Sequence, residues 1–460
     1  MNIVKQISTM CTMNYTETLE YLFTSLPQYS RIGTAAYKDG LENTLALDKH
    51  FGYPHRKFKT IHIAGTNGKG STSHLLAAAL QQAGYKTGLY TSPHLKDFRE
   101  RIRINGEMID ENFVVDFVAE NRTFFDELSP SFFEMSVLMA FDYFAEKEVD
   151  VAVIEVGLGG RLDSTNIIMP ELSVITNISL DHTNLLGNTL EKIAAEKAGI
   201  IKPNIPVVIG ESSGVKRVFE EKARQENAPI YFAEECYSIL DCFVPRNDAE
   251  NNTNNVIASD SEAIQRYKYE LKKTKKNWSE KGEINLGLLG DYQQKNLATA
   301  LTAVQVLNEN NFHISEDAVR FGFEKVVELT GLLGRWQVLQ KNPTIICDVG
   351  HNEVGISCIV EQLKTIQYNK LHFVLGMVSD KDVDKVLSLL PSENTVYYFT
   401  KASIPRALNE IELQQKALKH NLHGDAYPTV KAAFEAAKKS AEKDDAVFVG
   451  GSNFVVAEVL

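Results

Sequence analysis

Short, nearly all-apolar runs recur along the chain, and each is followed by a stretch with the periodicity of a helix. The first series of runs lies at 59–65, 149–157, 172–179 and 205–210. Parallel strands covered by helices on both faces give such runs, whereas the strands of a one-sided sheet alternate between apolar and polar residues. Helical patterns such as 71–83 and 190–198 separate the runs. This alternation predicts an α/β domain with a mainly parallel sheet.

A second series of apolar runs begins after Trp336 and lies at 343–350, 370–377, 394–400 and 445–451. Helical patterns at 355–366 and 430–443 separate them, so a second, smaller and Rossmann-like α/β domain is expected. We place the boundary near Leu329–Leu333, which gives a first domain at 1–328 and a C-terminal domain at 329–460.

Residues 245–282 differ from both series because they are mostly polar, with the sequences NDAENNTNN and KKTKKNWSEKGE. Few residues there could bury apolar surface, so we predict a surface insertion that is partly mobile. The basic run at 272–276 is typical of a solvated face, and a functional basic patch is the alternative.

Composition and charge narrow the classes of function. The 460 residues are 44% apolar and 23% charged, which is ordinary for a globular protein with large cores. The net charge of −12 argues against a nucleic-acid partner but not against ATP, which a local loop of amides and one lysine can bind. The five cysteines form no C-x-x-C pair, no run approaches the ~18 apolar residues that span a bilayer, and the N-terminus lacks the apolar core of a signal peptide. A cytoplasmic protein with no membrane partner is therefore expected.

The first apolar run leads into the sequence GTNGKGS at 65–71. A strand, a glycine-rich turn and a helix can form an anion site, because glycines let the backbone approach phosphate and exposed helix N–H groups donate to it. Lys69 would reach the outer phosphates, and Ser71 could add a hydroxyl to phosphate or magnesium. The pattern G-x-x-x-x-G-K-[ST] is not met, since Ile63 stands where its first glycine belongs and Gly70 separates the lysine from the serine. We interpret the stretch as a variant phosphate loop, with an ordinary glycine-rich turn as the alternative.

Other polar residues stand where apolar runs end. Glu155 ends one run, and a carboxylate at the carboxyl end of a parallel strand suits magnesium, which prefers oxygen ligands. The alternative is a strand-end charge that reaches solvent. His182 follows the next run and could be a metal ligand or a helix cap. The alternation in RERIRI at 99–104 predicts a strand with a charged face.

Three residues would have structural roles by residue type alone: Ser92 in a turn, Lys197 on a solvated helix face and His62 in a packed core. In the second domain, a buried run ends in the sequence CDVGHN with Asp348, His351 and Asn352, and Arg335 precedes this run. The sequence GDYQQKN places Gln293, Gln294 and Asn296 at a helix start. These polar side chains could bind a base, a ribose or a phosphate, or they could be caps and turns.

Taken together, these motifs resemble the folylpolyglutamate synthase/dihydrofolate synthase family, within the Mur-type ATP-dependent amide ligases. The matching segments occur in the family's order over nearly the whole chain: GTNGKGS, YTSPHL, ERIRING, DVAVIEVGLGGRLDSTN, LDHTNLLG, EKAGIIK, GDYQQKN, DVGHN, SDKD and PRAL. The extreme N-terminus and residues 245–282 lie outside the match.

The resemblance implies a P-loop-type ATPase domain followed by a glutamate-ligase domain, with ATP between them. It implies phosphate binding by Gly65, Thr66, Asn67, Gly68, Lys69, Gly70 and Ser71. It implies Mg²⁺ ligation by Ser92, Glu155 and His182, and a second metal site through a carbamylated Lys197, whose carbamate would supply an anionic oxygen that plain lysine lacks. It also implies nucleotide contacts by Asn296, Arg335 and Asp348, with His351 and Asn352 beside the transferring phosphate, and a pterin site lined by Phe133, Asp163 and Ser164.

The reaction implied by the resemblance is the ATP-dependent joining of L-glutamate to a pterin carboxylate through an acyl phosphate. GGRLDSTN is similar to the bifunctional form, which acts on dihydropteroate and on folates, and SFFEM at 131–135 lies where the family has a pterin-site aromatic residue. A monofunctional folylpolyglutamate synthase is the alternative. DVGHN has Val349 and Gly350 where many members have glycine and alanine, a change that keeps small residues beside the phosphate. The enzyme is expected to be a monomer.

Three other classes of protein are weighed against this one. A peptidoglycan-precursor Mur ligase would need a nucleotide-binding domain before the loop, and the preceding segment is too short for most such domains. A P-loop NTPase switch or motor would not need the second domain. A scaffold protein without activity would not need the two lysines, the glutamate and the histidine.

Overall fold

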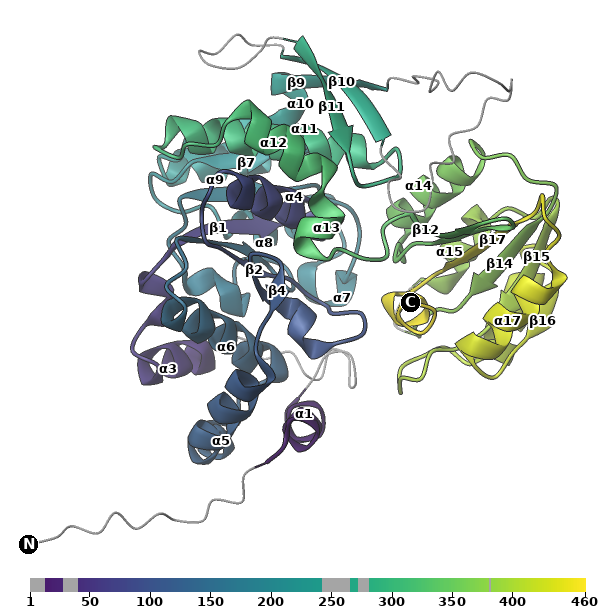
Figure 1. Ribbon diagram of the computed structural model, residues 1–460, viewed down its shortest axis with the longest axis horizontal. Coiled ribbons are helices and arrows are strands. Elements are labelled where there is room, and N and C mark those ends of the chain that lie inside the picture. Colours follow the sequence, from purple (N-terminus) through teal and green to yellow (C-terminus); the bar gives the residue numbers. More distant parts are fainter. Residues whose placement is uncertain (1–12, 28–39, 242–264, 272–280, 380–381) are drawn as a thin grey trace, which may run out of the picture.

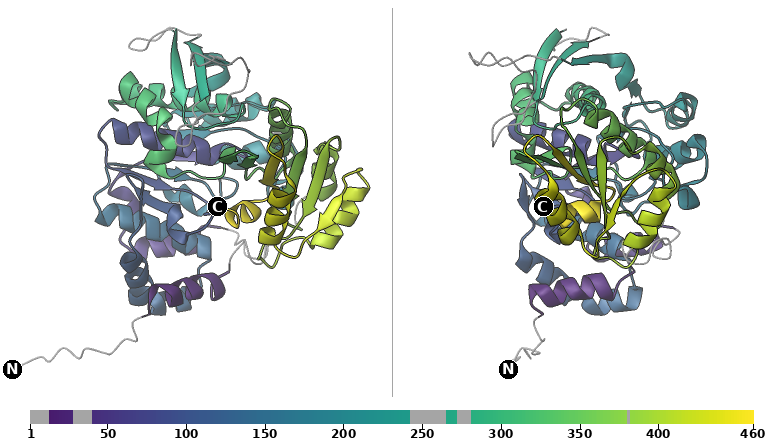
Figure 2. Two further views of the ribbon diagram at one scale, coloured as in Figure 1. Left: turned by 45° about the vertical axis from the view of Figure 1, so that its right-hand side comes forward. Right: turned by 90° about the vertical axis from the view of Figure 1, so that its right-hand side faces the viewer.

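The computed structural model describes residues 13–27, 40–241, 265–271, 281–379 and 382–460. In these residues the chain forms a larger α/β domain and a smaller C-terminal α/β domain, which lie side by side (Figures 1 and 2). The C-terminus lies on the side of the smaller domain that faces the larger one (Figure 1). The predicted fold class is thus confirmed.

An eight-stranded sheet with the order β4-β3-β2-β5-β1-β6-β7-β8 forms the centre of the larger domain. Its strands are parallel from β2 to β8 in this order, and β3 and β4 extend one edge antiparallel. The strands are β1 (Lys59–Ala64), β2 (Thr87–Tyr90), β3 (Ile102–Ile104), β4 (Glu107–Met108), β5 (Val151–Glu155), β6 (Leu172–Ile175), β7 (Val207–Ile209) and β8 (Ile230–Phe232). The four apolar runs of the first series therefore correspond to β1, β5, β6 and β7.

Both faces of this sheet are buried, which explains why its strands are apolar throughout. In β5, Val151 and Val153 pack in one core, and Ala152 and Ile154 pack in the core on the opposite face. The first core also contains residues of α4 (Lys69–Gln82), α11 (Gln293–Glu309), α12 (Glu316–Glu324) and α13 (Val326–Thr330). The opposite face is covered by α1 (Tyr15–Thr24), α3 (Glu42–His50), α5 (Glu111–Leu128) and α6 (Phe132–Glu146), and further along by α8 (Leu190–Ala198) and α9 (Lys216–Gln225).

The segment RERIRI does not form the predicted strand with a charged face. Its first half lies in the 3₁₀-helix η3 (Phe98–Arg101), and only β3 is extended. Arg101 and Arg103 are buried because neighbouring elements cover them: Arg101 donates to His94 Nδ1 at 2.8 Å, and Arg103 donates to the carbonyl of Gly106 at 3.0 Å. An alternating pattern shows which residues share a face but not what packs against that face.

A three-stranded antiparallel sheet, β11-β10-β9, lies over α11 and α12 (Figure 1). It consists of β9 (Tyr237–Asp241), β10 (Gln265–Leu271) and β11 (Lys281–Leu286), and α10 (Ala233–Cys236) precedes it. β10 belongs to the segment 245–282, yet it buries Tyr267 and Tyr269 in the core of the larger domain. The expectation that few residues of this segment bury apolar surface is therefore wrong for β10, whose tyrosines alternate with exposed polar residues. Residues 245–264 and 272–280, including the basic run, lie outside the described residues.

The C-terminal domain has a six-stranded sheet with the order β12-β13-β17-β14-β15-β16, parallel except for β12. Its strands are β12 (Gln337–Lys341), β13 (Thr344–Cys347), β14 (Leu371–Leu375), β15 (Thr395–Phe399), β16 (Gly424–Ala426) and β17 (Ala446–Gly450). α14 (Glu353–Leu363), α15 (Val383–Leu389) and α16 (Glu410–Leu418) cover one face, and α17 (Val430–Ser440) and α18 (Asn453–Ala457) cover the other. The second series of apolar runs corresponds to β13, β14, β15 and β17.

The connection between the domains is very short. The predicted boundary between residues 328 and 329 falls inside α13, which packs against α4, and Leu332 is still buried in the core of the larger domain. Gly334 already packs against Val349 and Val456 of the C-terminal domain, since a Cβ there would meet their methyl groups at 2.8 and 3.3 Å. Leu333 is thus the residue between the last contact with one core and the first contact with the other.

We predict that the β3–β4 turn tolerates no side chain at Gly106. Its φ is +86°, and a Cβ would lie 2.2 Å from the carbonyl oxygen of Leu329 in α13. Gly84 is the matched control, because its φ is +90° but nothing lies within 4 Å of a Cβ. Gly84→Ala should lower the free energy of unfolding by ~1–2 kcal/mol through the left-handed backbone alone. Gly106→Ala should lower it by a further ~1–3 kcal/mol, as measured by urea denaturation, because α13 must also shift. Equal losses would contradict the close packing of this turn on α13.

Candidate active site

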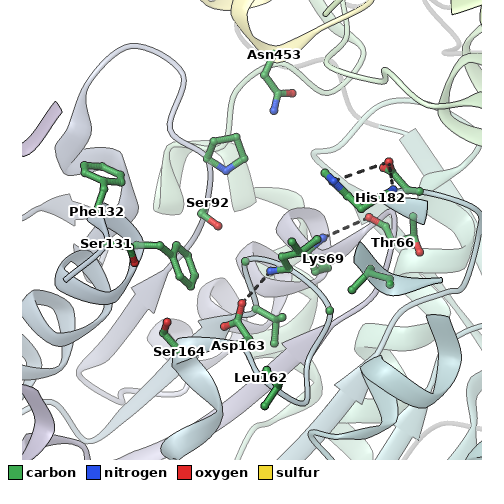
Figure 3. Close-up of a pocket in the computed structure, with 18 of the residues that line it drawn as sticks. Thr66, Lys69, Ser92, Ser131, Phe132, Leu162, Asp163, Ser164, His182 and Asn453 are labelled. Atoms are coloured by element: carbon green, nitrogen blue, oxygen red, sulfur yellow. Dashed lines mark hydrogen bonds and ion pairs between the residues drawn. The ribbon is translucent and has the colours of Figure 1, made fainter. Parts of the chain in front are cut away.

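A cavity of about 300 Å³ opens where four parallel strands end. Its lining includes residues that follow β1, β2, β5 and β6, which is the edge where open α/β sheets bind their ligands. Figure 3 shows Lys69, Ser92, Asp163 and His182 around one space, with Asn453 of the C-terminal domain opposite. The C-terminal domain also contributes His351, Val378, Arg406, Ser452 and Phe454 to the lining. The cavity is therefore formed by both domains.

The phosphate-loop candidate connects β1 to α4 in a shape that requires glycine. Gly68 precedes the first residue of α4 with φ +83°, and a Cβ there would lie 2.2 Å from Asn296 Oδ1. Gly65 has φ +149°, and its Cβ would meet the hydroxyl of Thr176 at 1.8 Å. The segment after β6 holds the loop in place: the Asn67 N–H donates to Asn177 Oδ1 at 2.9 Å, and the Thr176 hydroxyl donates to the Asn67 carbonyl at 2.6 Å. The loop is thus pre-formed at a helix N-terminus, as an anion site needs to be.

Two lysines donate to the same carbonyl oxygen of this loop. Lys69 Nζ lies 3.1 Å from Gly65 O and 3.3 Å from Thr66 O, and Lys197 Nζ lies 2.9 Å from Gly65 O. Lys197 comes from α8 and is 4% exposed. Burial lowers the pKa of Lys197 to about 7, and the positive charge of Lys69 acts in the same direction. At neutral pH a large fraction of the Lys197 side chain is therefore an uncharged, nucleophilic amine, and the residue is not the solvated helix lysine expected from its type alone.

Glu155 ends β5 beside these lysines and is 4% exposed. Burial raises the pKa of its carboxyl to about 7, although the charges of Lys69 and Arg335 act in the opposite direction. The backbone N–H of Ser92 lies 3.4 Å from its Oε2. His182 has a left-handed backbone with φ +49° at the start of α7 (Thr183–Leu186), and its side chain reaches the cavity. The side chain of His182 makes no capping hydrogen bond to α7.

The chemistry of these side chains fits a hard divalent cation. A buried carboxylate is costly without a positive partner, and Ser92 and His182 offer an oxygen and a nitrogen donor at the same edge. In the part of the chain that is described, no group of three or more His, Cys, Asp or Glu is placed to hold a metal by itself. Mg²⁺ usually keeps several waters and binds substrate phosphates. A ligand set with Glu155 as its one carboxylate would therefore hold the ion only together with a bound nucleotide.

A partly aromatic pocket with a fixed carboxylate forms another part of the cavity lining. The ring of Phe133, in α6, packs against Gly157, where a Cβ would meet it at 2.4 Å. Asp163 caps the 3₁₀-helix η4 (Ser164–Ile167): its Oδ1 accepts from Thr165 N at 3.0 Å and Thr165 Oγ1 at 2.5 Å. Its Oδ2 accepts from Leu158 N at 2.8 Å. Both carboxylate oxygens are therefore held in position, and Asp163 can present a defined acceptor to a ligand.

His62 contributes to this arrangement from inside the sheet. It is fully buried in β1, as expected for a packed histidine, and its Nε2 lies 2.8 Å from Thr165 Oγ1. Because the Thr165 hydroxyl donates to Asp163, it can only accept from His62, so the proton of the imidazole is on Nε2. The chain His62–Thr165–Asp163 thus links the sheet to the pocket.

The three residues expected to contact a nucleotide lie around the first turn of α4 and the domain connection. A Cβ on Gly70 would lie 3.3 Å from Arg335 Nη2, so this arginine reaches from the connection to the phosphate-loop candidate. Asn296 Nδ2 donates to Gln293 Oε1 at 2.7 Å, and Gln293 Nε2 donates to Ser71 Oγ at 3.3 Å. Asp348 is buried and accepts from Tyr292 OH, Trp336 N and Gly350 N at 2.6–2.7 Å. These bonds give Asp348 a structural role between the domains in addition to any contact with a ligand.

Comparisons with known proteins place this geometry in a family. The Mur ligase middle domain matches residues 63–304, and the Mur ligase glutamate ligase domain matches residues 334–453. The dihydrofolate synthase/folylpolyglutamate synthase of Bacillus subtilis is 33% identical over 432 residues, which cover 92% of this chain and 94% of that protein. The chain belongs to the dihydrofolate synthase/folylpolyglutamate synthase family.

Solved structures of this family agree with the assignment. Escherichia coli FolC in complex with DHPP and ADP superimposes with a TM-score of 0.81 at 28% identity over 98% of both chains. A bifunctional family member with Mn, AMPPNP and L-glutamate bound has a TM-score of 0.78 at 29% identity, again over 98% of both chains. Family membership makes this chain an ATP-dependent ligase of the Mur type rather than a P-loop switch or a scaffold. Within the described segments, no helix is long and apolar enough to cross a membrane.

Within this family member, the structure brings together many of the residues singled out from the sequence. Those that line the cavity are Gly65, Thr66, Lys69, Ser92, Phe133, Asp163, Ser164, His182, Lys197 and His351. Others are not part of this lining: Asn67, Gly68, Gly70, Ser71, Glu155, Asn296, Arg335 and Asp348. Sequence reasoning missed Arg101, which lines the cavity with its guanidinium 5.1 Å from the centre of the Phe132 ring. The arginines of RERIRI are a visible signal in the sequence, but their alternation predicts only a strand with a charged face.

We predict that Glu155→Gln stabilises the ligand-free protein at pH 8. The pKa of Glu155 is raised from 4.5 to about 7 on folding, so its stabilising contribution is complete below pH 4.5 and is lost as the pH rises through about 7. The glutamine side chain in the variant is neutral at every pH, so the variant does not lose this stability as the pH rises. The melting temperature of the variant should exceed that of the wild type by roughly 3–6 °C at pH 8 and by much less at pH 5. Glu107→Gln, at an exposed position of β4, is the control. An equal difference at both pH values would contradict a buried, titrating carboxyl.

Proposed function

We propose that this chain joins L-glutamate to the carboxylate of dihydropteroate and to the γ-carboxylate of folates, at the expense of ATP. The observation that carries the proposal is the single cavity in which the phosphate-loop candidate, the Phe133–Asp163 pocket and the C-terminal domain meet. The relatives support it, since the Bacillus subtilis and Escherichia coli proteins are named as bifunctional enzymes and a solved relative binds DHPP and ADP. In this assignment Phe133, Asp163 and Ser164 line the pterin end.

The chemistry requires a carboxylate to become a good electrophile. Its oxygen attacks the γ-phosphorus of ATP, the bond to the β-phosphate oxygen breaks, and an acyl phosphate and ADP form. The neutral amine of L-glutamate then attacks the acyl carbon, phosphate leaves, and the amine proton is lost as the amide forms. The loop 65–71 fixes the phosphates, and Lys69 compensates the charge that moves during the transfer. Asn296, Arg335 and Asp348 would form the nucleotide end, and His351 would lie beside the transferred phosphoryl group.

Magnesium would be held by Ser92, Glu155 and His182, where it would neutralise phosphate oxygens. We further propose a second magnesium position through a carbamate on Lys197. The neutral amine adds to CO₂ and loses a proton, which converts a cation into an oxygen anion. A lysine that is enclosed and has a pKa of about 7 supports this, because the reaction requires the uncharged amine. The carbamate oxygens would supply the anionic ligand for the second magnesium ion.

Two forms of the enzyme are compatible with the family. A relative from Lacticaseibacillus casei, 32% identical over 86% of this chain and 88% of its own length, is named as a folylpolyglutamate synthase only. We favour the bifunctional form because the relatives from Bacillus subtilis and Escherichia coli, each 33% identical to this chain, are named dihydrofolate synthase/folylpolyglutamate synthase. We also propose a functional monomer, which sedimentation would check.

The substrate assay separates these forms. Purified protein with ATP, Mg²⁺ and L-glutamate is incubated with dihydropteroate or with tetrahydrofolate, and products are identified by mass. We expect both substrates to gain one glutamate residue, with one ADP formed for each amide. If only tetrahydrofolate gained a glutamate residue, the enzyme would be of the monofunctional form. Turnover of neither substrate would remove the proposed function.

We predict that Lys197→Ala loses at least ~100-fold in kcat and regains part of it with small carboxylates. Removal of the carbamate deletes a metal ligand, and acetate or formate can place an oxygen anion in the space of the lost side chain. The matched control is Lys192→Ala, at an exposed position of the same helix α8. Full activity of Lys197→Ala, or the same carboxylate stimulation in the control, would contradict the carbamate.

A further inference from the structure

One side-chain amide of the C-terminal domain bridges two segments of the larger domain. Asn352 Nδ2 lies 2.9 Å from Asn67 Oδ1 in the phosphate-loop candidate and 3.2 Å from Asp181 Oδ2. Asp181 directly precedes His182, which carries the cavity-lining imidazole. The Asn352 side chain is 6% exposed, so its two N–H groups are directed into the protein and both have acceptors. It therefore contacts the phosphate end and the metal end of the proposed site together.

The direction of this amide is set by a helix cap. Asn352 is the N-cap of α14, and its Oδ1 accepts from the backbone N–H of Gly355 at 2.9 Å. Turning the amide over would exchange the oxygen for an NH₂ group and remove the cap. The cap thus holds the oxygen toward α14 and presents the NH₂ group to the larger domain.

The two acceptors are themselves held in place. Asn67 is tied to the segment after β6, because its backbone N–H donates to Asn177 Oδ1 at 2.9 Å and its Nδ2 donates to Ser179 Oγ at 3.3 Å. The other oxygen of Asp181 accepts from the backbone N–H of His182 at 2.8 Å. The bridge therefore joins α14 to a rigid part of the larger domain rather than to mobile side chains.

His351, the residue before Asn352, also approaches the carboxylate of Asp181. His351 Nε2 lies 4.0 Å from Asp181 Oδ2, the same oxygen that Asn352 contacts, and His351 Nδ1 lies 3.0 Å from Val349 O. A small rotation of α14 would change both approaches to Asp181 together. The position of His351 in the cavity thus depends on the Asn352 bridge.

We propose that Asn352 is a positioning residue: its amide fixes the orientation of the C-terminal domain against the phosphate loop and the Asp181–His182 turn, so that the two halves of the site are aligned for the transfer. The proposal deepens the proposed function and rests on it for the kinetic test. The alternative role, that of a helix cap alone, needs only the oxygen of the side chain and none of its donors.

Two substitutions separate these roles. Asn352→Asp keeps a capping oxygen of nearly the same shape but removes both donors, and Asn352→Ser keeps a short capping oxygen without adding charge. We expect Asn352→Ser to retain the melting temperature within about 2 °C and both variants to bind ADP within threefold of the wild type. Their kcat should fall at least tenfold. The matched control is Asn409→Asp, because Asn409 caps α16 in the same domain and does not line the cavity; its kcat should be unchanged.

A double substitution tests whether Asn352 acts through the phosphate loop. If Asn352 and Asn67 act through one hydrogen bond, Asn352→Ser combined with Asn67→Ser should be no slower than the slower single variant within about twofold. Small-angle scattering of the full chain with ADP should show a broader distance distribution in Asn352→Ser than in the wild type, which loss of a cap alone would not produce.

The possible outcomes are distinct. Wild-type rates in both Asn352 variants, a loss confined to Asn352→Asp, or effects that multiply in the double variant would overturn the proposal. A loss of kcat that follows a lower melting temperature would assign Asn352 to the cap. A wild-type protein without ligase activity would instead remove the proposed function, while the scattering experiment would still test the bridge.

Discussion

The carbonyl oxygen of Gly65 accepts hydrogen bonds from two lysine side chains, and one of these lysines is enclosed by protein. Burial lowers the pKa of Lys197 to about 7, and the positive charge of Lys69, which donates to the same acceptor, acts in the same direction. Burial shifts the pKa of Glu155 in the opposite direction: it raises this pKa, because a buried carboxyl favours its neutral form. In the proposed function, phosphate and metal ions would complete the charges at this edge of the sheet, and such a site can favour a transition state over the empty protein.

The remainder of the larger domain keeps these groups where they are. Three buried core clusters cover the two faces of the parallel sheet, and they hold the strands that lead into the loop, Glu155 and the Asp181–His182 turn. Close backbone contacts add to this. A Cβ on Gly160 would lie 2.8 Å from the carbonyl of Glu196, so the last turn of α8 packs directly on the segment after β5. This contact contributes to the burial of Lys197, and burial is the main cause of the lowered pKa of this lysine.

Local pattern was enough to predict the parallel sheets, the glycine-rich loop and the position of Glu155 at a strand end, because each depends on residues close together in the chain. The residues whose roles depend on distant partners could not be predicted in this way. Arg103 is covered by α13 and the connection after it, Tyr267 fills a core formed by helices on either side of it in the chain, and Asn352 reaches Asn67 across 285 positions. Asp348 shows that a motif can give only part of a residue's role. The sequence predicts a functional residue there, and the structure adds hydrogen bonds from Tyr292 and Trp336 to its carboxylate. The resemblance to a family supplied roles for Ser92 and Lys197 that their own surroundings in the sequence do not indicate.

The short connection at Leu333 joins the domains beside the phosphate-loop candidate, because the guanidinium of Arg335 approaches Gly70. Asn453 and Phe454 line the cavity from the last helix, within one turn of Val456, and Val456 packs against Gly334. The few residues that link the domains therefore also anchor two parts of the site, the arginine beside the loop and the helix that carries part of the cavity rim.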